Sequence, residues 1–253
     1  MSFGNKNHDN LKTNPYAALA HNYAGPAANA AANERLAFIR RTYLHVAGAV
    51  AAFIAIEMVI FGLFGDQIMA KVLPMITGWS WLVVLGAFMG VSWLAQKWAH
   101  NETSQSTQYA GLSLYVVAQA LIFVPLLAIA ANFSPAGTIL TAAILTLIVF
   151  GGLTAIVFVT KKDFSFLGPA LTIGFLAAMG AIIVGTVMGL NIFGMFFAAA
   201  MVLLVSGSIL YNTSNMLHHY RTDQHVGAAL SLFADLAILF WYILRLVMMF
   251  AEE

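Results

Sequence analysis

The stretch TILTAAILTLIVFGGLTAIVFVT, residues 138–160, decides the fold of this chain. It contains no ionisable side chain, and an α-helix of this length crosses the roughly 30 Å hydrocarbon core of a lipid bilayer. Its apolar residues are continuous rather than alternating, which favours a helix over a strand of a membrane β-barrel. We therefore expect a transmembrane helix over these residues.

Six further apolar stretches of similar length surround this one. They cover residues 42–64, 79–98, 108–131, 167–190, 192–212 and 226–250. The composition agrees, because 61% of the residues are hydrophobic and 8% are charged, far from the roughly 45–50% and 25% of soluble domains. The sequence thus predicts an all-α, polytopic membrane protein with a bundle of seven transmembrane helices. The link at residues 190–192 is nearly too short for a turn.

The chain divides into two parts. Residues 1–35 are rich in Asn and Ala and too polar to form a core of their own, so we expect a cytoplasmic tail, and residues 36–253 form the seven-helix membrane domain. No apolar core of about 7–15 residues follows the start, so we expect no cleaved signal peptide. The loops on the opposite side of the predicted bundle contribute only one basic residue, Lys71. The positive-inside rule therefore places the N-terminus in the cytoplasm and the C-terminus on the outer side. The basic residues that favour this orientation are Arg35, Arg40, Arg41, Lys97, Lys161, Lys162 and Arg221.

Two ionisable residues are expected near the outer ends of their helices. Glu57 and Arg245 both lie roughly 22–28 Å from the predicted cytoplasmic end, at about 1.5 Å of rise per residue. Charged groups within a membrane usually face a bundle interior or water and pair with one another. We expect an ion pair between Glu57 and Arg245, which serves either as a structural clamp between helices or as an outer gate.

Asp235 is the third ionisable residue within a predicted span, near the middle of the last helix. Ser231 lies one turn before it, and Asn212 lies at a comparable depth in the preceding helix. Burial disfavours the charged form of a carboxylic acid, so Asp235 is a candidate pH-sensing group on an ion path. The alternative is a protonated Asp235 that only holds a neighbouring helix by a hydrogen bond.

Several function classes find no support in the sequence. The net charge of +1 provides no basic stripe for nucleic acid. The chain has no cysteine and none of the common hydrolase, zinc-protease or phosphate-loop motifs, so we expect neither an enzyme nor catalytic residues. We also expect no cofactor, and calcium only as a transported ion.

Three histidines, His218, His219 and His225, follow the sixth predicted helix. Adjacent histidines on a loop do not provide the convergent ligands of a metal site. They are expected to be solvated loop residues or a pH-sensitive latch. Asp235 remains a weak candidate for metal binding.

Four motifs resemble those of the Bax inhibitor-1 family, also called the transmembrane BAX inhibitor motif family, in its bacterial YccA-like branch. They are RTYL at 41–44, KDFSFLG at 162–168, YNTS at 211–214 and ALSLFAD at 229–235. The resemblance covers residues 35 to 250. It implies a seven-helix fold with the last helix central, in a bacterial inner membrane.

The resemblance also implies a pH-sensitive leak of calcium or other cations that two paired aspartates govern. Asp235 matches the second aspartate, whereas Asn212 stands in place of the first. An amide does not titrate, so calcium binding should be weaker and the pH response simpler or absent. Glu57 and Arg245 match the acid–base pair between helices.

Two functions therefore stay open at the level of the sequence. One is a cation leak channel or a pH-linked regulator of ion homeostasis. The other is a non-conducting interaction protein that modulates a membrane-anchored AAA protease or serves as an accessory subunit of a larger membrane complex. In both, the first partner is the lipid bilayer.

Overall fold

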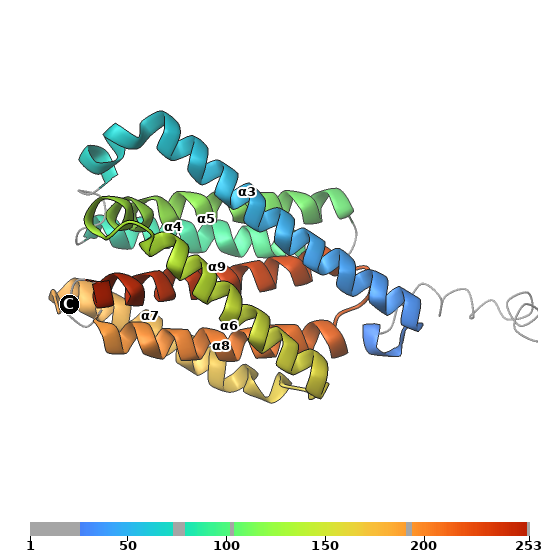
Figure 1. Ribbon diagram of the computed structural model, residues 1–253. Helices are drawn as coiled ribbons and strands as arrows, with labels where there is room; N and C mark the ends of the chain where they lie inside the picture. Colours follow the sequence, from blue (N-terminus) through green and yellow to red (C-terminus); the bar gives the residue numbers. More distant parts are fainter. Residues whose placement is uncertain (1–25, 73–78, 102–103, 191–193, 252–253) are drawn as a thin grey trace, which may run out of the picture.

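A computed structural model describes residues 26–72, 79–101, 104–190 and 194–251. Within these residues, seven helices are long and apolar enough to span a membrane, which confirms the predicted fold (Figure 1). The predicted tail up to residue 25 and the short link at 191–193 lie outside the described residues. The seven helices are α3 (Ala32–Val72), α4 (Trp79–Ala99), α5 (Gln105–Phe133), α6 (Thr138–Thr160), α7 (Gly168–Met188), α8 (Met195–His218) and α9 (His225–Ala251).

The first helix is longer than its apolar stretch. α3 begins at Ala32, well before the predicted start at 42, and carries Glu34 in its first turn, where an acidic side chain is favourable next to the positive end of the helix dipole. A short 3-10 helix, η1 (Ala27–Asn29), precedes it. The backbone N–H of Ala27 donates to the carbonyl oxygen of Tyr220 at 2.8 Å. The described end of the polar segment is thus attached to the link between α8 and α9.

Local sequence explains several helix ends. The side chain of Ser104 accepts a hydrogen bond from the N–H of Thr107 at 3.3 Å and caps α5. Gly137, just before α6, has a φ of 92°, and Gly189, just after α7, has a φ of 64°. Side chains with a Cβ rarely adopt this left-handed conformation, so glycine allows the chain to turn sharply there.

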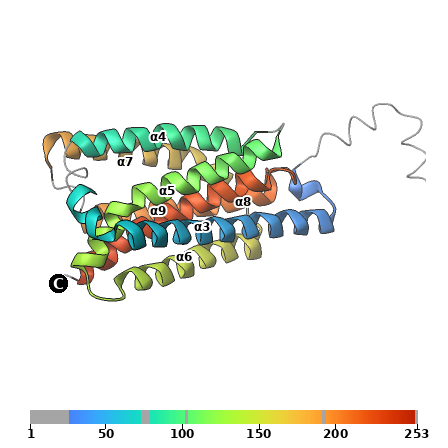
Figure 2. The ribbon, with the colours of Figure 1, turned by 90° about the horizontal axis from the view of Figure 1, so that it is seen from above.

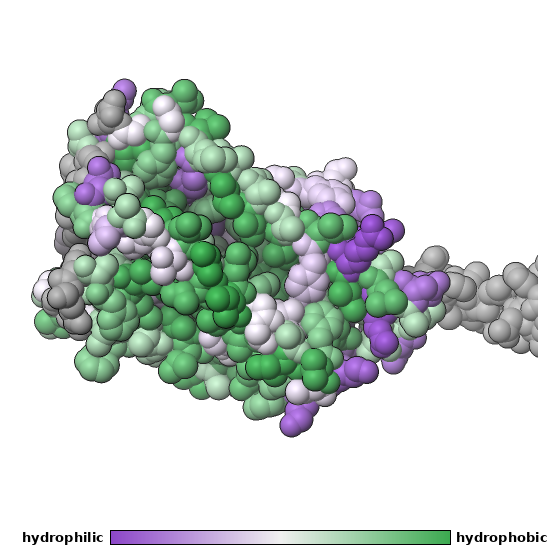
Figure 3. All heavy atoms as spheres, viewed as in Figure 1, coloured by the Kyte–Doolittle hydropathy of each residue, from purple (hydrophilic) through white to green (hydrophobic). Residues whose placement is uncertain are grey.

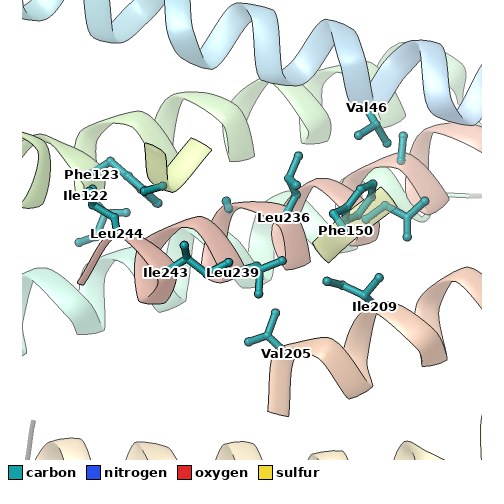
Figure 4. Packing of buried hydrophobic residues seen from close by; sticks show 14 of the residues in the cluster. Val46, Ile122, Phe123, Phe150, Val205, Ile209, Leu236, Leu239, Ile243 and Leu244 are labelled. Atoms are coloured by element: carbon teal, nitrogen blue, oxygen red, sulfur yellow. The ribbon is translucent and has the colours of Figure 1, made fainter. Parts of the chain in front are cut away.

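α9 lies at the centre of the bundle, as expected. It packs against α3, α4, α5, α6 and α8. Figure 4 shows Leu236 and Leu239 of α9 among side chains from neighbouring helices, such as Val205 of α8 and Phe150 of α6. The sequence did not predict that α5 is also largely buried, with fifteen buried residues. The core therefore forms around two helices, α5 and α9, which lie next to each other in Figure 2.

Large hydrophobic side chains cover the outside of the bundle. Leu140, Val159, Leu176 and Phe196 are examples with more than half of their surface exposed, and soluble monomers rarely expose apolar patches of such extent. Hydrophilic residues gather at the end where α3 begins (Figure 3). We call this the basic end of the bundle; α4, α6 and α8 end there. The arrangement fits a protein surrounded by lipid.

Candidate functional site

Asp235 joins α8 to α9 through two hydrogen bonds. The Ser208 hydroxyl donates to its Oδ1 at 2.7 Å, and the Nδ2 of Asn212 donates to its Oδ2 at 2.8 Å. Ser208 and Asn212 are one turn apart on α8, so both face the same point of α9. Asp235 is only 5% exposed. The structure thus brings together Asp235, Asn212 and Ser208, which lies one helical turn before Asn212.

Ser231 lies on the side of Asp235 that faces the basic end. Its hydroxyl donates to the Gly227 carbonyl oxygen at 3.2 Å and lies 3.4 Å from the Tyr220 hydroxyl. The Tyr220 hydroxyl lies 3.2 Å from the Nε2 of His100, whose Nδ1 is 2.9 Å from the Gln96 carbonyl oxygen. That carbonyl requires Nδ1 to carry a proton, so in a neutral imidazole Nε2 is an acceptor and Tyr220 donates to it. Polar groups from the end of α4 and the start of α9 therefore form a line of contacts.

This line begins at a hollow at the basic end. A cavity of about 400 Å³ lies between the start of α7 and the link from α8 to α9, and Tyr220 lines it. Burial is the main cause that raises the pKa of Tyr220 above its ordinary value, so the hydroxyl stays protonated at neutral pH. The other lining residues are Ser165, Tyr211, Asn215, His219 and Gln224.

The link between α6 and α7 is attached to the end of α8. The buried Ser214 hydroxyl accepts from the N–H of Phe164 at 2.8 Å and lies 3.2 Å from Oδ1 of Asp163. The Nε2 of His219 lies 3.2 Å from Oδ2 of Asp163. The pKa of Asp163 falls to about 2, chiefly because the backbone N–H of Ser165 donates to its carboxylate.

The three histidines have different surroundings. His219 pairs with Asp163 and is exposed, whereas the Nδ1 of His218 lies 3.0 Å from the carbonyl oxygen of Ser214. His225 is buried at the start of α9, where its ring lies 5.1 Å from that of His45. Across the described residues, no group of three or more His, Asp or Glu side chains is arranged to hold a metal ion.

The expected Glu57–Arg245 ion pair is not formed, although both residues belong to the described part of the chain. Neither carboxylate oxygen of Glu57 has a hydrogen-bond partner there. Glu57 lines a cavity with Phe240 of α9, whereas Arg245 lines two others. Phe240 and Arg245 are five positions apart, which corresponds to about 140° of rotation around a helix. Arg245 therefore faces away from the side of α9 that Phe240 presents to Glu57. Glu57 and Arg245 thus lie on different sides of α9.

Comparisons with known proteins identify relatives along most of the chain. Residues 35–252 match the family described as "Inhibitor of apoptosis-promoting Bax1". An uncharacterized protein of Pseudomonas aeruginosa is 31% identical over 65% of this chain and 72% of its own length. Bax inhibitor 1 of Schizosaccharomyces pombe is 29% identical over 88% of this chain and 80% of its own. The modulator of FtsH protease YccA of Escherichia coli is 31% identical over 40% of this chain and 46% of its own. No solved structure is significantly similar to this chain.

Proposed function

Because the chain belongs to the Bax inhibitor-1 family, we propose that it is a pH-linked leak channel for calcium or another cation in a bacterial inner membrane. Asp235 is the proton-binding group in this proposal, and Asn212 and Ser208 are the groups that respond to it. The observation that carries the proposal is the buried contact between α8 and α9, in which both carboxylate oxygens accept a hydrogen bond.

Protonation would change this contact because of the chemistry of its partners. An ionised carboxylate only accepts hydrogen bonds, whereas a carboxylic acid carries one O–H donor. The Asn212 Nδ2 group only donates, so a proton on Oδ2 would require the amide to turn its oxygen towards Asp235. A proton on Oδ1 would instead require the Ser208 hydroxyl to change from donor to acceptor. Either change alters how α8 packs on α9, which is the kind of two-state element that couples a proton to a conformation.

The line of contacts from the basic end leads towards Asp235 and ends at Ser231, one helical turn away from it. Tyr220 borders the cavity at that end, and its hydroxyl lies 3.4 Å from that of Ser231. Ser231 is one helical turn from Asp235 and therefore lies on the same face of α9. In this proposal the cytoplasmic pH reaches Asp235 from the basic end, where the basic residues of the chain gather.

The departure at Asn212 predicts a simple pH response. A pair of carboxylates would share a proton and titrate in two coupled steps, whereas Asp235 beside an amide binds a single proton. We therefore expect the flux to depend on pH as one ionisation. Calcium should bind weakly, because only one charged oxygen ligand is present at the contact.

The test is calcium flux into liposomes that contain the purified protein, from about pH 5 to about pH 8. We expect the flux to lose its pH dependence in Asp235→Asn and to gain a steeper one in Asn212→Asp. Asn215→Asp, on the same helix but at the cavity of the basic end, serves as the control and should behave like the unchanged protein. A flux that is identical in the unchanged protein and in Asp235→Asn would contradict the proposal.

A second function is favoured by a different observation, the partial similarity to a relative that is named as a modulator of a protease. In this second proposal, the chain belongs to the YccA-like branch and conducts no ions. It modulates a membrane-anchored AAA protease or is an accessory subunit of a larger membrane complex. The absence of flux at every pH, in folded protein, would favour this function. A protease that co-purifies with this chain, and that degrades its substrates at a different rate when the chain is present, would then support this second function.

A further inference from the structure

A large cavity opens on the side of α9 that faces away from Arg245. It has a volume of about 620 Å³, within the range of sites for small ligands. Phe233, Leu236 and Phe240 of α9 form its floor together with residues of α5, and α3 and α6 form its walls. Both of these helices pack on α9 but hardly on each other, and both cross in front of α9 in the view of Figure 1.

The cavity is open towards the side of the bundle. Ile54 and Met58 of α3 and Leu140 and Leu147 of α6 line it, and each is about half exposed or more. These residues belong to the apolar surface of the bundle, and Figure 3, seen from the same direction as Figure 1, shows hydrophobic residues around the hollow on this face. An apolar chain can therefore enter from the hydrocarbon of the membrane without crossing a polar barrier.

One ionisable side chain lines this apolar space. Glu57 is 7% exposed, and neither of its carboxylate oxygens has a hydrogen-bond partner within the described chain. Of the described residues that line the cavity, it alone carries an ionisable group. The hydroxyl of Ser134, which also lines the cavity, is buried and lacks a partner too. Buried polar atoms without partners are rare in proteins because each one costs free energy.

We propose that this cavity is a binding site for a single-chain amphiphile with a primary ammonium head group, which Glu57 holds by an ion pair. A primary ammonium has three N–H donors, enough for both Glu57 oxygens and one further acceptor. The apolar chain lies along α9 between α3 and α6 and extends to the opening. The volume fits one chain better than a whole two-chain lipid.

The proposal is independent of the cation leak, because Asp235 makes its contacts to α8 and does not line this cavity. Charge complementarity selects the occupant. A fatty acid would place a second acidic group beside Glu57, and a neutral alcohol would supply only one donor and no charge to the carboxylate.

The experiment measures binding of dodecylamine to the full chain in phosphatidylcholine nanodiscs, with dodecanol as the neutral probe of equal length. We expect dodecylamine to bind on the order of tenfold to a hundredfold more tightly than dodecanol, as for hydrogen bonds to a charged group. Glu57→Gln should remove this difference. Glu34→Gln changes an exposed glutamate in the first turn of the same helix and should leave it intact.

A second variant protects the test if Glu57→Gln does not fold. Ala143→Phe fills the cavity from α6 and leaves Glu57 unchanged, so it should abolish dodecylamine binding. Equal affinities of the two probes for the unchanged protein would overturn the proposal, as would full binding to Ala143→Phe. Displacement of dodecylamine by phosphatidylethanolamine in the nanodisc would overturn the single-chain occupant in favour of a whole lipid.

Discussion

Replacing Asn212 by alanine should weaken the contact between α8 and α9 by a measurable and partner-specific amount. The Asn212 Nδ2 donates to Oδ2 of Asp235 at 2.8 Å, and the substitution leaves that oxygen buried without its donor. Such a loss costs about 1–3 kcal/mol. A double-mutant cycle of Asn212→Ala and Asp235→Ala isolates the pair, because the double variant has neither partner. The coupling should be about 1.5–3 kcal/mol for an ionised Asp235 and about 0.5–1.5 kcal/mol for a neutral one.

The assay is equilibrium unfolding of the four proteins in mixed micelles titrated with sodium dodecyl sulfate. A parallel cycle of Asn215→Ala with Asp235→Ala provides the control, because Asn215 is half-buried on the same helix and lines the cavity at the basic end instead. The control cycle should be additive within about 0.5 kcal/mol. A coupling of Asn212 with Asp235 as small as that of the control would refute the reasoning.

Two further predictions concern the basic end and the packing of α4 on α5. The low pKa of Asp163, about 2 chiefly because of the backbone N–H of Ser165, stabilises the fold above the ordinary aspartate pKa, and this contribution is lost as the pH falls towards 2. The unfolding midpoint of the unchanged protein should therefore decline more than that of Asp163→Asn between about pH 4 and about pH 2, and parallel curves would contradict this. Gly111→Ala should unfold at a markedly lower denaturant concentration than the unchanged protein, because its Cβ would lie 2.5 Å from the Ala95 carbonyl oxygen. Gly86→Ala is the control, because its Cβ would meet no atom within 4 Å, and it should be neutral or slightly stabilising. Similar unfolding midpoints for the two variants would argue against the close approach at Gly111.

The sequence predicted helices and depths well, because both depend only on distance along the chain. Seven apolar stretches became seven helices, and the depths estimated for Asn212 and Asp235 placed them within hydrogen-bond distance. A fixed rise per residue makes such estimates reliable. The start of α3 was missed because the polar residues after Ala32 continue the helix beyond its apolar stretch.

The rotation of each helix was not predictable in the same way. Lipid chains are as apolar as a protein core, so a membrane helix such as α5 shows no polar face that marks its outside. No pattern in the sequence therefore indicated that a large part of α5 is buried. For the same reason Glu57 and Arg245 could be assigned a similar depth but not a common face. His100 and Tyr220 were missed because they meet through helix ends that are far apart in the chain.

Glu57 and Asp235, the carboxyl groups that are buried in the described part of the chain, have opposite surroundings, and this difference separates their roles. Asp235 has a donor for each oxygen and lies in the tight contact between α8 and α9. Glu57 has no donor within the described residues and borders open apolar space. A satisfied group can bind or release a proton by rearranging partners that are already present, whereas an unsatisfied group gains most from a partner that comes from outside. The first arrangement suits a switch within the protein, and the second suits a binding site for a ligand.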